Sequence, residues 1–383
     1  MLIFVLHIIY ISICYNSKML SLNKTILSIV SILVFVGFFT FLSASLTYLD
    51  NPNVFKKLFL IQFISIILGF LSIFFIYKHK KINFLSIRKY SLIFFGFSLL
   101  LQLAVLVPHL GVSINGATRW LNIGFMTIQP SEIFRFTSIL FLANVFYSYS
   151  RELEKDFNLF LKIMIPFLLF VGGFYLWIRD IGSLMIFSVS IFAILLFTKI
   201  DKGKLFLYSF VSILVLLPLI YFTMPHAKKR IDTYLGISKV DNRADNYQSY
   251  NMEKAIGSGQ IFGLGYGKSM QKFNGVIPEA VSDSVFSIYA EEFGFLGSVI
   301  LISLYLWLSI LIFWHIPKIK NAYQRYVAAG LSTNILFPAF FNIGTTLAIM
   351  PLSGMPLTFI SKGGTSIFIS LVSVGIIMLF FKK

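Results

Sequence analysis

Charged residues are scarce in this chain. Asp, Glu, Lys and Arg make up only 12% of the 383 residues, against roughly 25% in an average soluble domain. Hydrophobic residues reach 57%, and the mean hydropathy is +0.86. A water-facing globule could not bury so much apolar surface, so the composition excludes an ordinary soluble enzyme and a disordered protein. It indicates an integral membrane protein.

Cysteine and acidic residues are also few. Cys14 is the only cysteine, which excludes an internal disulfide and a thiolate metal site. Lys and Arg number 32 against 15 Asp and Glu, giving a net charge of +17. In a membrane protein this excess is typical of basic cytoplasmic loops beside anionic lipid, so we expect membrane lipid and no nucleic acid as a partner.

Long apolar runs predict the fold class. A helix needs about 20 apolar residues to cross the hydrocarbon core of a bilayer. We therefore predict an all-α polytopic integral membrane protein with about ten transmembrane helices, which form a single membrane domain over residues 25–383. The predicted spans are 25–47, 58–77, 90–108, 130–149, 158–178, 181–199, 204–224, 284–313, 326–349 and 365–381.

The distribution of Lys and Arg predicts the orientation. Basic residues concentrate in the connections 78–89, 151–162, 199–204 and 318–325 and at the C-terminus, and short basic loops stay in the cytoplasm. Both termini are then cytoplasmic. One long extracytoplasmic loop, residues 225–283, joins helices 7 and 8, and we expect it to contain one or two short helices.

Residues 1–24 are predicted to form a cytoplasmic or interfacial segment. The stretch Leu2–Cys14 is apolar, but at about 13 residues it is too short to span a bilayer. It has neither a basic start nor a small-residue cleavage site, so we do not expect a cleaved signal peptide. Met1 and Met19 both remain candidate start residues.

Ionisable residues inside the spans are costly in lipid and point to functional sites. Glu132 and Arg135 are three residues apart, so they share a helix face and can form a locking ion pair. Asp180 lies in a turn, where it can cap the next helix or belong to the site. Glu291 and Glu292 point about 100° apart on a helix, so at least one must face protein or water.

Basic residues also lie on the predicted outer face, against the usual bias. His226, Lys228, Lys229 and Arg230 follow the seventh span, and Arg119, Arg179 and Lys362 lie in outer turns. Solvation at the interface explains any single one of them. Together they predict a site for an anionic group at headgroup depth, such as a lipid-linked pyrophosphate.

Asp283 stands where the long loop enters the eighth span. A carboxylate at that depth is partly desolvated, which favours a general base. The alternative interpretation is structural, an N-cap for the helix that follows. The residues alone leave both interpretations open.

Four motif blocks resemble the SEDS family (FtsW, RodA and SpoVE) of shape, elongation, division and sporulation proteins. Their order and spacing match from about residue 25 to the C-terminus. The blocks are Gly116-Ala117-Thr118-Arg119-Trp120 with Gln129-Pro130-Ser131-Glu132; Asp180-Ile181-Gly182-Ser183; Ala255 to Gly267 with Pro278-Glu279 through Asp283 to Gly294; and Asn342-Ile343-Gly344 with Pro351, Gly354 and Phe359 to Ser366.

This resemblance implies a peptidoglycan glycosyltransferase of the bacterial plasma membrane. Such enzymes polymerise lipid II at the outer face, release undecaprenyl pyrophosphate, and work with a class B penicillin-binding protein and other divisome or elongasome proteins. Asp283 matches the aspartate that takes the proton of the acceptor sugar 4-hydroxyl, and the reaction is inverting. No cofactor is expected to bind tightly, but Mg²⁺ or Mn²⁺ would accompany the substrate pyrophosphate. Of the two cellular roles, division is favoured over elongation.

Other residues are candidates for supporting roles. No residue is assigned to a protein-held metal site. The candidates for binding substrate and pyrophosphate are Arg119, Lys228, Lys229, Arg230, Gln248, Ser361 and Lys362, and the structural residues are Glu132, Arg135, Asp180, Glu291, Glu292, Gly363 and Gly364.

The chain also departs from the family pattern. Val281-Ser282 stands where the family usually has His-Thr before the aspartate, and Lys362 replaces a usual Tyr. Two other functions therefore stay open. A lipid II flippase would need a continuous polar path through the bundle, and a non-catalytic scaffold would only activate its penicillin-binding partner.

Overall fold

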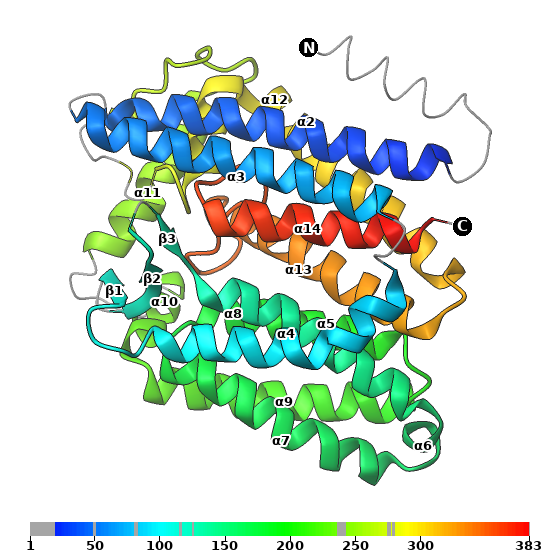
Figure 1. Ribbon diagram of the computed structural model, residues 1–383. Coiled ribbons are helices and arrows are strands. Elements are labelled where there is room, and N and C mark those ends of the chain that lie inside the picture. The colour runs from blue at the N-terminus through cyan, green and yellow to red at the C-terminus, as the bar shows by residue number, and fades with distance from the viewer. Residues whose placement is uncertain are drawn as a thin grey trace.

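The structure, a computed structural model, describes residues 20–48, 51–79, 83–114, 117–124, 126–235, 243–273, 277 and 280–382. Most of the predicted N-terminal segment, and residues 116, 278 and 279 of the motif blocks, lie outside the described residues. The described chain is a bundle of helices that run back and forth (Figure 1). Every predicted span coincides with one helix: α2 (Leu20–Ser45), α3 (Pro52–Lys78), α4 (Phe84–Ala104), α5 (Pro130–Ser148), α7 (Phe157–Trp177), α8 (Ile181–Leu196), α9 (Lys202–Thr223), α12 (Val285–His315), α13 (Ala322–Thr346) and α14 (Gly364–Phe380).

Seven of these helices are long and apolar enough to cross a membrane: α2, α3, α4, α7, α9, α12 and α13. The helices α8 and α14 are apolar but shorter, and α5 carries Glu132 and Arg135. The protein is therefore a multi-pass membrane protein, while the number of crossings stays a prediction.

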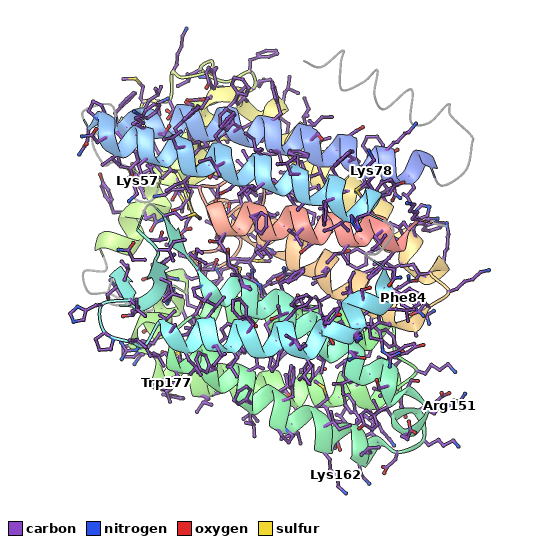
Figure 2. All side chains as sticks on the ribbon, in the orientation of Figure 1. Lys57, Lys78, Phe84, Arg151, Lys162 and Trp177 are labelled. Carbon is purple, nitrogen blue, oxygen red and sulfur yellow. The ribbon has the colours of Figure 1, made fainter. Side chains whose placement is uncertain are left out.

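The connections divide the bundle into two unlike ends. Figure 2 labels Lys57 and Trp177 at one end and Lys78, Phe84, Arg151 and Lys162 at the other. We call the first the loop end. Its connections hold η1 (Leu46–Tyr48), α10 (Pro225–Tyr234) and α11 (Arg243–Ser258), so the long loop does contain short helices, and the opposite end holds α6 (Ser150–Lys155) and η3 (Ile316–Lys318).

A small antiparallel sheet at the loop end was not predicted. Its strands β1 (Gly111–Ile114), β2 (Ala117–Asn122) and β3 (Thr127–Ile128) pair in the order β1-β2-β3, with a bulge at Val112/Ser113. The strands are too short for a clear alternation of apolar and polar residues. Their role is positional, because β2 carries Arg119 and the sheet leads directly into α5.

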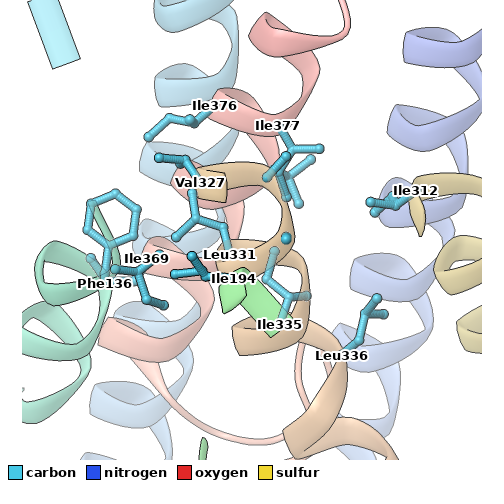
Figure 3. Close-up of a cluster of buried hydrophobic side chains, with 14 of the residues drawn as sticks. Phe136, Ile194, Ile312, Val327, Leu331, Ile335, Leu336, Ile369, Ile376 and Ile377 are labelled. Atoms are coloured by element: carbon cyan, nitrogen blue, oxygen red, sulfur yellow. The ribbon is translucent and has the colours of Figure 1, made fainter. Parts of the chain in front are cut away.

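The core is built around α13, which packs on α5, α8, α12 and α14. Figure 3 shows Val327, Leu331 and Ile335 of α13 among buried side chains of neighbouring helices. Close approach depends on Gly330, where a Cβ would lie 2.6 Å from Ile139 and 2.9 Å from Ile194. Small residues allow this kind of helix contact in membranes, where apolar burial alone gives little driving force.

Candidate functional site

A cleft of about 1170 Å³ opens into the bundle at the loop end. Its walls come from α3, the sheet, α5, α8, α10 and α13, and from the segment that joins α13 to α14. Most of the predicted site residues meet there. Those that line the cleft are Arg119, Glu132, Arg135, Asp180, Lys229, Arg230, Asp283, Lys362, Gly363 and Gly364.

Asp283 reaches the cleft from the segment just before α12. Ser284 occupies the N-cap position of that helix, so Asp283 is not its cap. Instead, three consecutive backbone carbonyls of residues 281–283 each accept a hydrogen bond from a distant part of the chain. The Lys362 amide donates to Val281 (2.7 Å), the Ser361 hydroxyl donates to Ser282 (2.5 Å), and Asn342 Nδ2 donates to Asp283 (2.7 Å).

Asn342 ties two walls of the cleft together. Its Nδ2 donates to the carbonyl of Asp283 and to that of Met355, both at 2.7 Å. The side chain is 1% exposed, so a lost bond could not be replaced by bulk water. The sequence places Asn342 in a motif block but gives no sign of this positioning role, because the contact joins residues far apart in the chain.

Gly354 leaves the space that the Asp283 carboxylate occupies. Its φ of +70° is in the left-handed region, which L-residues rarely adopt. A Cβ added there would lie 3.3 Å from Asp283 Oδ2 and 3.9 Å from Arg230 Nη1. The carboxylate and the guanidinium therefore approach the same glycine. Arg230 is held by its bond to the Leu352 carbonyl (3.3 Å).

Two further cations, which were not on the list of substrate-binding candidates, also line the cleft. Lys57 comes from α3, and Arg179 comes from the turn between α7 and α8. Arg179 has a φ of +58°, and its carbonyl accepts a hydrogen bond from Arg119. With Lys229, Arg230 and Lys362, they give the cleft a strongly positive wall, which suits an anionic ligand.

A second group of charges lies deeper, at the level of α5. Arg135 donates to Ser183 (3.2 Å) and to Asn334, and its charge attracts Glu132. Asp180 Oδ1 accepts from the Ser183 amide at 3.1 Å, which confirms its predicted capping of α8. In the part of the chain that the structure describes, Glu132 Oε2 and Asp180 Oδ2 are buried without a hydrogen-bond partner.

Five predicted residues lie outside the cleft lining. Gln248 on α11 donates to the Ser284 hydroxyl (3.1 Å), so it supports the segment that carries Asp283. The Ser361 hydroxyl accepts a hydrogen bond from the Leu357 amide (2.7 Å) and donates one to the Ser282 carbonyl. Lys228 Nζ lies over the Tyr221 ring, 5.4 Å from the ring centroid. Glu291 and Glu292 are buried against a different segment.

The described residues provide no set of ligands that could hold a metal ion without the substrate. Among the described residues, no group of three or more His, Cys, Asp or Glu side chains could hold an ion. The cleft offers carboxylates from Glu132, Asp180 and Asp283 beside its basic wall. Mg²⁺ commonly binds through one or two carboxylates and substrate phosphates, so a substrate-borne cation stays a prediction.

The family model of FtsW/RodA/SpoVE cell cycle proteins matches residues 23–382. The chain belongs to this family. The probable peptidoglycan glycosyltransferase FtsW of Polynucleobacter necessarius is 29% identical over 378 residues, covering 95% of this chain and 86% of that protein. The FtsW of Coxiella burnetii, with the same description, is 32% identical over 300 residues, covering 76% and 78%.

Solved structures share the fold. A chain of a peptidoglycan synthase complex, solved to study how polymerization and crosslinking are coordinated, aligns with a TM-score of 0.75 at 23% identity, covering 93% of this chain and 96% of that one. The rod shape determining protein RodA of Thermus thermophilus aligns with a TM-score of 0.65 at 23% identity, covering 93% and 95%.

Proposed function

We propose that this protein is a peptidoglycan glycosyltransferase that polymerises lipid II into glycan strands. The observation that carries the proposal is the cleft in which Asp283 lies together with a wall of Arg and Lys side chains. Relatives aligned over most of their length bear the name of this activity. Because those relatives are FtsW proteins, a role in cell division is favoured over elongation.

In the proposed reaction, Asp283 acts as the general base. It accepts the proton of the acceptor sugar 4-hydroxyl while the hydroxyl oxygen attacks C1 of the donor sugar. The bond from C1 to the pyrophosphate oxygen breaks, and undecaprenyl pyrophosphate leaves. An α-linked donor gives a β-linked glycan by this single displacement, with no covalent enzyme intermediate.

The basic wall would stabilise the charge that develops on the leaving pyrophosphate. Lys229 and Arg230 reach the cleft from α10, and Arg119 reaches it from β2. Fixed cations in a partly dehydrated cleft act more strongly than cations in water. Mg²⁺ or Mn²⁺ bound to the pyrophosphate would add positive charge at the same place.

The loop end would face the outside of the bacterial plasma membrane, as the distribution of basic residues predicts. The substrate then enters with its headgroup at the cleft and its isoprenoid chain in lipid. A class B penicillin-binding protein is the expected partner, because the structural neighbour comes from a peptidoglycan synthase complex. Other divisome proteins would join through that partner.

The floor of the cleft favours a polymerase over a flippase. The lining reaches Asn334 on α13. One turn further toward the opposite end, Gly330 packs directly against Ile139 and Ile194. A polar headgroup crossing the bundle would have to open this apolar contact. A polymerase that works at the loop end needs no such opening.

The test is a gel assay of lipid II polymerisation by purified protein with and without its penicillin-binding partner. The partner carries a blocked transpeptidase site, so that glycan ladders report polymerisation alone. We expect ladders from the wild type and a loss of at least 100-fold with Asp283→Asn, because the amide cannot accept the proton.

Asp232→Asn is the matched control. Asp232 lies in α10 in the same outer loop and accepts a bond from Tyr221 (2.8 Å), but it does not line the cleft. It should retain wild-type ladders. Absence of ladders from the wild type with partner and Mg²⁺ or Mn²⁺ present would support the flippase or scaffold function. Full activity of Asp283→Asn would remove the proposed base.

A further inference from the structure

The glycine-rich segment Gly259–Met270 packs against the N-terminal part of α12, at the loop end, and does not line the cleft. It follows α11 and reaches the point where α12 is broken at Gly294, whose φ of +68° and ψ of −167° are not helical. A Cβ at Gly263 would lie 2.2 Å from the Glu292 carbonyl oxygen. The two backbones are therefore in direct contact.

The segment and the helix break satisfy each other's backbone groups. The amides of Leu264 and Gly265 donate to the carbonyls of Glu291 and Glu292, both at 3.0 Å. In return, the amides of Phe295 and Leu296 donate to the carbonyls of Gln260 (2.8 Å) and Ile261 (3.1 Å). Irregular backbone is tolerated at membrane depth only when its polar groups are paired in this way.

Buried charges anchor the same segment from its far side. Lys272 Nζ lies 2.9 Å from Glu292 Oε1, and both side chains are fully buried. Lys272 also donates to Ser43 of α2 (2.8 Å) and to the Gly267 carbonyl (2.9 Å). Glu291 accepts from the Met270 amide (3.1 Å). These contacts confirm that both glutamates face protein.

The outward side of this firmly held segment is apolar. Phe262 is 80% exposed and Met270 is 72% exposed, and Ile261 and Leu264 are exposed as well. Their neighbour across the helix break, Phe295, is 64% exposed. We call Ile261, Phe262, Leu264 and Met270 the apolar crest.

The crest continues the exposed apolar faces of the adjoining helices. On α12, Phe295, Val299, Leu306 and Ile310 are exposed at helical spacing. On α2, the Phe39 carbonyl accepts a bond from the Tyr266 hydroxyl (3.0 Å). Phe39 lies six residues before Ser45, the last residue of α2, which is about 9 Å along the helix axis.

We propose that the apolar crest is inserted in the lipid leaflet at the loop end, where it contacts phospholipid acyl chains. Interfacial elements bury apolar side chains about 5–10 Å into the boundary between headgroups and acyl chains, which matches the depth reached by Tyr266. This insertion would fix the depth at which the N-terminal part of α12 lies in the membrane. This proposal is independent of the reaction assigned to the cleft.

The test measures the surroundings of single positions by fluorescence quenching in vesicles of phosphatidylcholine and phosphatidylglycerol. In a Cys14→Ser background, Phe262→Cys is labelled with a small fluorophore. Quenching is compared between lipids with a nitroxide on the upper acyl chain and aqueous iodide. We expect the nitroxide lipid to quench position 262 at least threefold more strongly than iodide does.

Two positions calibrate the measurement. Leu306→Cys on the exposed face of α12 should report lipid, and Lys254→Cys on the exposed surface of α11 should report water. Met270→Cys replaces Phe262→Cys if the latter fails to fold. Quenching at 262 or 270 that follows the iodide pattern of position 254 overturns the proposal. Loss of lipid quenching when the penicillin-binding partner is added also overturns it, because the crest would then be a protein interface.

Discussion

The helices α13 and α9 show how differently two membrane helices of similar length can be used. In α13, 89% of the most apolar stretch is buried inside the protein, whereas in α9 the share is 6%. Yet α13 is the more polar helix, with Ser332, Thr333, Asn334 and Asn342 among its buried residues. In α9 most of the exposed residues are apolar.

This contrast is the reverse of that in a soluble protein. Lipid is as apolar as Leu, so a lipid-facing helix must be apolar all round, while a buried helix can carry small and polar residues that pack and hydrogen-bond. The site depends on the buried kind, since α13 supplies both Asn334 and Asn342. The same type of substitution should therefore have very different effects on stability and activity at a buried position and at a surface position.

The largest difference is expected for ion pairs. Lys272→Met leaves Glu292 buried without its cation, which costs about 3–5 kcal/mol. The matched change is Lys199→Met, because Lys199 and Glu154 form an exposed pair at 3.3 Å of the kind worth about 0–1 kcal/mol. Thermal unfolding in detergent measures both. Equal shifts in Tm would show that the Lys272 pair is not desolvated.

Asn342→Ala should come next, with its main effect on activity. The change removes two hydrogen bonds and leaves the buried carbonyls of Asp283 and Met355 unpaired. We expect this to lower the free energy of unfolding by about 1–3 kcal/mol. We expect kcat for polymerisation to fall at least tenfold, with a smaller change in KM.

The control is Asn23→Ala on α2. Asn23 is also buried and donates to the Met378 carbonyl (3.0 Å), but it lies far along the chain from the cleft residues and does not line the cleft. It should lower Tm by a similar amount without changing kcat. An equal fall in kcat for both variants would reduce the role of Asn342 to general stability.

Substitutions at a buried and at an open glycine should differ in stability by an intermediate amount. Gly330→Leu forces a side chain into the contact with Ile139 and Ile194 and should cost about 1–3 kcal/mol or more. At Gly96 on α4 a Cβ would meet nothing within 4 Å, so Gly96→Leu should be neutral or slightly stabilising. Tm values of the two variants check this, and a neutral Gly330→Leu would mean that α13 can move away from α5 and α8.

The sequence was sufficient to locate the membrane helices, because each contains an apolar run. It also drew attention to Asp283, an aspartate where the long loop enters a span; the structure places this residue in the cleft, and its role as a base stays a prediction. It was not sufficient for contacts that fold the chain back on itself. The sheet at residues 111–128, the bond from Asn342 to Asp283 and the pairing of Lys272 with Glu292 all join segments through tertiary geometry. Lys57 was not among the predicted site residues, since the local sequence pattern carries no information on what its side chain faces.

The smallest expected effect isolates crowding at the proposed base. Gly354→Ala adds a methyl group 3.3 Å from Asp283 Oδ2 and also meets the cost of a positive φ, which is of order 1 kcal/mol. Gly267→Ala meets the same backbone cost at φ +79°, but its Cβ would touch nothing within 4 Å. The difference between the two variants therefore reports the contact with the carboxylate rather than backbone strain. We expect equal losses of Tm but a several-fold lower kcat for Gly354→Ala alone, and equal kcat values would mean that the carboxylate can shift away without losing its function.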